Sequence, residues 1–193
     1  MTETRTPFSE LARRRRSNLR MDPDRPIAEA VIDELLAIAA TAPNHHRTHP
    51  WRFRIITGEG RRGLGDALAS RLLADPDPDP TIQTARVAKA RSKYLRAPVM
   101  VVVAARSGTD EVTTLENRDA VSASIQTLLL AATDHGLASL WSTGEAARCV
   151  EVASFCGFDP TDTVLGLIYL GWPTAELEPV ERPMPESVRI DRA

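Results

Sequence analysis

The sequence contains few cysteines, and this limits the redox chemistry expected of its thiols. Cys149 and Cys156 are the only two among 193 residues, whereas small secreted domains held together by disulfides carry many more. We expect both in one helix, roughly 10 Å apart, which is too far for a disulfide bond. The cysteine content therefore predicts a reducing, cytoplasmic compartment.

The sequence also lacks an excess of charge of one sign and a long apolar run. Its 24 basic and 26 acidic side chains give a formal net charge of −2, so no global field attracts nucleic acid or an anionic membrane. The longest apolar run, Pro98–Ala105, is far shorter than the roughly 20 residues of a membrane-spanning helix. No apolar stretch typical of a signal peptide follows the first residues. We therefore expect neither a nucleic-acid nor a membrane partner.

A chain of this length is expected to form one domain over residues 1–193, with a substantial core. Helical or alternating spacing of apolar residues divides it into elements. We expect helices over 7–16, 26–42, 59–73, 81–95, 119–135 and 145–156, and strands over 51–57, 98–105, 137–141 and 164–171. Helices and strands do not alternate regularly, so the pattern favours an α+β fold.

Two proline-rich segments lie outside these elements. Residues 75–80 repeat Asp-Pro three times, which predicts a stiff, exposed linker. Residues 172–193 form a tail with no apolar core of its own. The linker also decides how a nearby glycine motif is interpreted.

That motif, formed by Gly58, Gly60 and Gly63, has the G-x-G-x-x-G spacing of a dinucleotide-binding loop between a strand and a helix. A dinucleotide fold would then return as a second buried strand ending in an acidic residue. The Asp-Pro linker stands there instead and cannot form a central strand. We therefore interpret the motif as an ordinary strand-to-helix turn.

Three histidines, His45, His46 and His49, lie in a polar loop between two prolines. The i, i+4 spacing of His45 and His49 would suit a metal on a helix, but Pro50 favours an extended conformation at His49. No acidic residue or cysteine is close in the sequence as a third ligand. We therefore expect no metal site, and a loop whose imidazoles line a pocket.

Four consecutive arginines, residues 13–16, precede Ser17. At the end of a helix, basic side chains in solvent complement the helix dipole. Alternatively, two guanidinium groups and a hydroxyl offer the donors that suit a terminal phosphate. Both interpretations remain open from these residues alone.

Several segments together resemble the nitroreductase family of flavin-dependent oxidoreductases, and especially its short, single-domain NAD(P)H nitroreductases. They occur in family order over nearly the whole chain: Arg15-Arg16-Ser17, the A-P…P-W-x-F segment over residues 41–53, Ala97-Pro98, Gly136-Leu137 leading to Trp141, and Leu170-Gly171-Trp172-Pro173. The resemblance implies a central, mostly antiparallel sheet flanked by helices. It also implies an intertwined homodimer with shared FMN sites, in which the tail over 172–193 packs on the partner subunit.

The resemblance further implies three groups of cofactor-binding residues. The first holds the FMN phosphate: Arg15, Arg16 and Ser17. The second lines the flavin: Thr41, His45 and His49. The third contacts the ring or the ribityl chain from the other side: Trp141, Ser142 and Thr143. A nicotinamide-binding region is implied for the segment from Ala131 to Gly136.

The implied reaction is ping-pong. NADH or NADPH reduces FMN, and the flavin then reduces a nitroaromatic, a quinone or a similar flat acceptor; no catalytic side chain is implied, because the flavin carries the chemistry. The sequence departs from the family at Leu19, Asn44 and His49, where a basic residue, a serine and a glutamine or glutamate are common. The loop also resembles enzymes that build the deazaflavin coenzyme. A deazaflavin-linked biosynthetic role, a flavin-binding protein that does not turn over, and a nucleic-acid-binding module are the alternatives.

Overall fold

A computed structural model describes residues 6–178 and 180–190. An antiparallel sheet of five strands forms its centre. The strands are β1 (Met21–Asp22), β2 (Trp51–Thr57), β3 (Val99–Ala105), β4 (Ala138–Ser142) and β5 (Thr163–Pro173). Their order is β1-β5-β3-β2, and β4 also pairs with β5. The predicted α+β class is confirmed.

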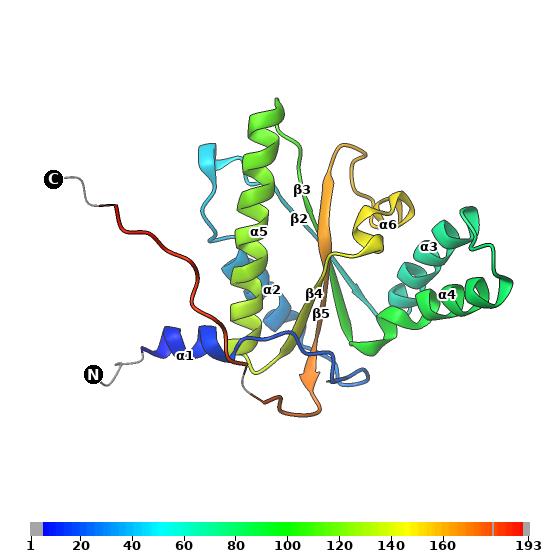
Figure 1. Cartoon of the computed structure of the whole chain (residues 1–193), viewed down its shortest axis with the longest axis horizontal. Coiled ribbons are helices and arrows are strands. Elements are labelled where there is room, and N and C mark those ends of the chain that lie inside the picture. The colour runs from blue at the N-terminus through cyan, green and yellow to red at the C-terminus, as the bar shows by residue number, and fades with distance from the viewer. Residues whose placement is uncertain (1–5, 179, 191–193) are drawn as a thin grey trace.

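Helices cover both faces of this sheet (Figure 1). They are α1 (Pro7–Arg14), α2 (Glu29–Ala39), α3 (Gly60–Ala74), α4 (Pro80–Ser92), α5 (Glu111–Asp134) and α6 (Val150–Phe155), with short 3-10 helices η1 (His45–Arg47), η2 (Lys93–Arg96) and η3 (Glu145–Arg148). One face packs against α2 and α5, and the other against α3, α4 and α6. No helix in the described ranges is long and apolar enough to cross a membrane.

Strand β3 shows why an entirely apolar run is needed at the centre. Each of its residues is buried. Because side chains alternate along a strand, Val101 and Val103 join the core beside α2 and α5, whereas Met100 and Val102 join the core on the other face. Both layers therefore depend on this one strand.

Several helix predictions are wrong in extent. Helix α5 begins at Glu111 rather than at residue 119, because its first two turns are polar or exposed and show no apolar period. The helix expected over 145–156 is divided into η3 and α6 by extended backbone at Cys149 (φ −96°, ψ 117°). The two cysteines therefore do not lie within one helix, although both are free and buried. Helix α2 also begins later than expected, at Glu29.

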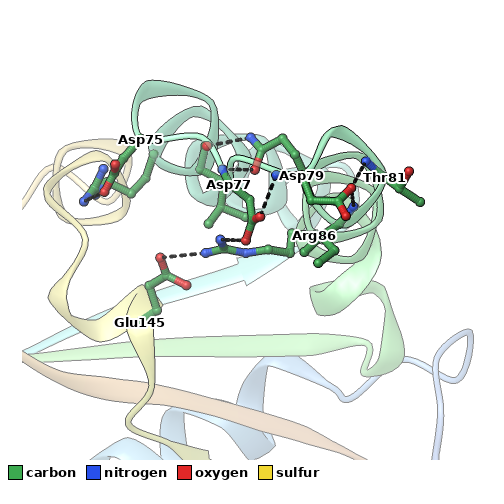
Figure 2. A network of polar contacts seen from close by, with 10 residues as sticks. Asp75, Asp77, Asp79, Thr81, Arg86 and Glu145 are labelled. Carbon is green, nitrogen blue, oxygen red and sulfur yellow. Dashed lines mark hydrogen bonds and ion pairs between the residues drawn. The ribbon is translucent and has the colours of Figure 1, made fainter.

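The Asp-Pro linker is exposed, as predicted, at every residue except the half-buried Asp77. Ion pairs and hydrogen bonds hold it in place (Figure 2). Asp79 accepts hydrogen bonds from the first backbone amides of α4. The guanidinium of Arg86 lies 3.3 Å from a carboxylate oxygen of Asp77 and 4.0 Å from one of Glu145. The linker and the segment after β4 are thus joined through α4. Since Arg86 is paired with carboxylates, this part of α4 does not present a purely basic surface.

The glycine motif forms the expected strand-to-helix turn. Gly58 adopts φ +52°, and α3 follows at once. A Cβ at Gly63 would lie 2.7 Å from the ring of Phe155, so this glycine permits close packing between α3 and α6. The motif is explained by packing within the fold.

Candidate functional site

A cavity of about 640 Å³ lies where α1, the C-terminal end of α5, the start of β4 and the tail meet. Its lining includes four arginines, namely Arg13, Arg14, Arg16 and Arg182. Glu10 and Glu176 also line it. Of the three residues predicted to bind the phosphate, Arg16 lines this cavity, whereas Arg15 and Ser17 are not part of its lining.

Arg15 and Arg16, both half-buried, have surroundings that suit an anion. The Nε atom of Arg16 is buried and has no hydrogen-bond partner among the described residues, although its Nη1 donates to the carbonyl of Glu178. Burial lowers the pKa of Arg15, and the neighbouring charge of Arg182 lowers it further. Neighbouring like charges favour binding of an anion, which would compensate both.

Arg182 is a site residue that sequence reasoning missed. Its guanidinium donates to the carbonyl oxygens of Arg15 (2.8 Å) and Arg13 (3.4 Å). Arg182 is one of three arginines in the proline-rich tail and has no sequence motif around it, because only the fold brings it to α1. Ser17, the residue after Arg16, is exposed and forms an isolated β-bridge with Ser139 of β4.

The predicted nicotinamide region follows the same end of α5. Gly136 is exposed, adopts φ +73°, and lines the cavity together with Arg16. Ala131 is buried and packs in the core against the sheet. Of these two, only Gly136 faces the cavity.

The histidine loop lies near the other end of α5 (Figure 1). His45 Nδ1 is 2.8 Å from a carboxylate oxygen of Glu116. No acidic residue is close to these histidines in the sequence, but the fold brings Glu116 of α5 to His45 from 71 residues away. One ligand atom from each of His45, His46 and Glu116 lies within 4.8 Å of the others.

A chain of hydrogen bonds fixes the loop against α5. The buried Asn117 donates to the carbonyl of Arg106 (2.9 Å) and accepts from the hydroxyl of Thr48. That hydroxyl accepts from the amide of Asn44 (3.0 Å), whose oxygen accepts from the backbone amide of His49 (2.8 Å). Asn44 thus connects the two ends of the loop.

The loop backbone is strained. His46, Arg47 and His49 adopt φ values of 56°, 51° and 47°, a region that residues other than glycine rarely occupy. Such conformations persist only where surrounding contacts enforce them, and they cluster at functional sites. The hydrogen bonds of Asn117 and Asn44 supply that enforcement.

The remaining predicted residues lie around these two regions. Thr41, at the end of α2, is exposed and donates to the carbonyl of Ile38 (2.7 Å). Trp141 donates to the carbonyl of Leu165 (3.2 Å), and its indole occupies the space that a Cβ at Gly166 would fill, 2.2 Å away. Ser142, like Trp141, is half-buried at the end of β4. Thr143 lines a separate cavity of about 460 Å³ with Arg71 and Arg148.

Within one chain, the predicted residues do not form a single pocket. The cavity with the arginines includes Thr133, and Glu116 contacts the histidine loop. At a rise of 1.5 Å per residue, these two positions on α5 are roughly 25 Å apart. The residues expected to hold the phosphate and those expected to line the flavin are therefore at opposite ends of one helix.

Comparison with known proteins agrees with this fold. The model of the Nitroreductase family matches residues 12–172. The chain belongs to the nitroreductase family. Membership makes it an oxidoreductase. The match includes both ends of α5 and every strand, so the resemblance seen in the sequence is confirmed.

Three relatives illustrate the similarity. The Escherichia coli K12 protein named "Putative NAD(P)H nitroreductase YdjA" is 28% identical over 165 residues, covering 85% of this chain and 87% of its own. A nitroreductase-like family protein from Bacillus cereus superposes with a TM-score of 0.81, at 24% identity over 95% of each chain. The FMN-dependent nitroreductase NfnB from Mycobacterium smegmatis, solved with NADPH, gives 0.72 at 22% identity, covering 96% of this chain and 98% of its own. The two structures support the fold.

Proposed function

We propose that this protein is an FMN-dependent NAD(P)H oxidoreductase that reduces nitroaromatics, quinones or similar flat acceptors. The observation that carries the proposal is the buried, unpaired Nε of Arg16 beside the like charges of Arg15 and Arg182. A phosphate monoester would supply the missing acceptor oxygens and the compensating negative charge. The relatives' names, which include NAD(P)H and FMN-dependent nitroreductases, support the same cofactors.

The residues present fit the phosphate end of FMN. Arg15, Arg16 and Arg182 would hold the phosphate with charged donors, and the exposed Ser17 would add a hydroxyl. When bound, FMN supplies the hydride chemistry between NADH or NADPH and the acceptor. The chain supplies the binding groups, the orientation and a place from which water is excluded.

The flavin would lie at the interface of a homodimer. No single FMN molecule can reach from the arginines to the histidine loop when the two are roughly 25 Å apart along α5. Two copies with antiparallel α5 helices would bring Arg15 of one protomer close to His45 of its partner. Thr41, His45 and His49 would then line the flavin from one side, and Trp141, Ser142 and Thr143 from the other.

The tail would complete this interface by packing on the partner subunit. Met184, Val188 and Ile190 are 90%, 78% and 77% exposed in the single chain. Such apolar side chains are stabilised when a second surface covers them. Gly136, which has no side chain to block the cavity, would leave room for the nicotinamide.

The proposal is tested first by the visible spectrum of the purified protein and by the chromophore released on heating. We expect yellow protein, one FMN per chain, dimers in light scattering, and oxidation of NADH or NADPH with an acceptor. Bound FMN that neither NADH nor NADPH reduces would indicate a flavin-binding protein without turnover. A protein that ignores added FMN but binds a deazaflavin would favour the biosynthetic alternative instead.

A further inference from the structure

We propose that His45, His46 and Glu116 form a binding site for one divalent transition-metal ion of the zinc class. The three side chains each offer a ligand atom, and these atoms lie within 4.8 Å of one another. This inference goes beyond the proposed function, since the site takes a ligand of its own and is tested without flavin.

The donor set suits zinc. Two imidazole nitrogens and one carboxylate oxygen form a known three-residue set for zinc, in which water completes the tetrahedron. His45 Nδ1 and Glu116 Oε1 are 2.8 Å apart and face each other in a hydrogen bond, so the fold already brings these two side chains together. A bound ion replaces this hydrogen bond, and the Nδ1 proton moves to Nε2 of the same ring or, from a doubly protonated ring, to the solvent.

The loop backbone brings two consecutive histidines to the same side. Neighbouring residues in a strand point to opposite faces, and in a helix they point in clearly different directions. The left-handed conformation of His46 (φ 56°) instead stacks its ring on that of His45, with centroids 3.8 Å apart. The hydrogen bonds from Asn117 and Thr48 hold this conformation against α5. The two imidazoles are therefore already side by side, and rotation of one ring out of the stack would bring a nitrogen of each to one ion.

The site is accessible and has a natural comparison within the chain. In the single chain the side chain of His45 is 64% exposed and that of Glu116 is 33% exposed, so an ion can enter from solvent when no flavin covers the loop. Farther along α5, His135 Nε2 lies 3.6 Å from a carboxylate oxygen of Glu34. This second pair belongs to no group of three metal-binding side chains among the described residues. It therefore serves as a matched control.

Zinc binding would connect the histidine loop to α5 through a third kind of bond, in addition to hydrogen bonds and packing. His46 is the most selective position for a test, because it is not among the residues proposed to line the flavin. His45 would be shared between the two ligands.

The experiment uses the full chain, free of any histidine tag, stripped with a chelator and titrated with zinc against a chromophoric competitor. We expect one zinc ion per chain, and a loss of affinity of more than about tenfold in His46→Ala and in Glu116→Gln. The matched control His135→Ala should bind as the wild type does. Cobalt bound in place of zinc should give the visible absorption of a low-symmetry nitrogen and oxygen site. His46→Ala and Glu116→Gln should both lose this absorption.

Three results would overturn the inference: no stoichiometric zinc binding by the wild type, equal affinity in all variants, or the same loss in His135→Ala. Thermal melting of each metal-free variant separates loss of a ligand from loss of fold. Since both substituted side chains lie at the surface or only half-buried, we expect the variants to melt close to the wild type.

Discussion

The two ends of helix α5 differ in the chemistry that they gather. At the N-terminal end, Glu116 meets two imidazoles on a strained loop. At the C-terminal end, arginines from α1 and the tail surround a cavity beside Gly136. The N-terminal end of α5 therefore offers ligands for a metal cation or hydrogen-bonding groups for a flavin ring. The C-terminal end offers positive charge for a phosphate. A cofactor that needs both kinds of group requires two copies of the chain.

The largest expected effect comes from disabling the phosphate end. Arg15→Ala combined with Ser17→Ala removes a guanidinium and a hydroxyl, each expected to contribute about 1.5–3 kcal/mol through charge-assisted bonds. FMN affinity should fall by about 100-fold or more, measured by flavin fluorescence during titration of the apoprotein. Arg20→Ala, an exposed arginine outside the cavity lining, is the control. Unchanged affinity in the double variant would place the phosphate elsewhere.

A second prediction concerns the hydrogen bonds of Asn117 that support the histidine loop. Asn117 is 2% exposed and satisfies both the carbonyl of Arg106 and the hydroxyl of Thr48. Asn117→Leu leaves these groups without their partner, so the free energy of unfolding should fall by about 1–3 kcal/mol. Chemical denaturation measures this change. Gln126→Leu, at an exposed position of the same helix, should have little effect, and an equal loss there would contradict the proposed support.

A third prediction tests whether the tail contributes to FMN binding through Arg182. Arg182→Ala should weaken FMN binding by about twofold to fivefold, because a partly exposed charge contributes less than a buried one. Higher salt should diminish the difference from wild type. Arg189→Ala, in the same tail but outside the cavity lining, is the matched control. If both variants lose the same FMN affinity, the tail acts through its overall charge and not through Arg182.

The sequence was most informative where one apolar pattern decided the structure. Alternation and burial identified β2 and β3 almost to the residue, because neither strand depends on distant polar contacts. Glu116 and Arg182 could not be predicted in the same way, since their partners are 71 and 167 residues away. The polar first turns of α5, which carry Glu116, were missed for a related reason, as they bury few apolar side chains. Both ends of the candidate site thus depend on contacts that only the fold creates.

The smallest expected effect concerns the beginning of α5, where Asp110 caps the helix. Its carboxylate accepts from the backbone amide of Thr113 (2.8 Å), and this bond, followed by that of the Thr113 hydroxyl, lowers the pKa of Asp110. Asp110→Ala should lower the melting temperature by about 2–4 °C at pH 7. The folded protein binds fewer protons at this group than the unfolded chain, so its stabilising effect is present above the unfolded pKa of about 3.9 and is lost as pH falls through the folded pKa.

Asp110→Asn separates the cap from the charge, since asparagine caps a helix well and does not titrate. At pH 7 this variant should melt close to the wild type. As pH falls below about 4, the wild type should lose stability relative to Asp110→Asn, because protonation weakens a cap that the amide retains. Parallel pH dependence of all three proteins would show that ionisation of Asp110 does not stabilise the fold, and equal melting of Asp110→Ala and wild type at pH 7 would show that the cap contributes nothing.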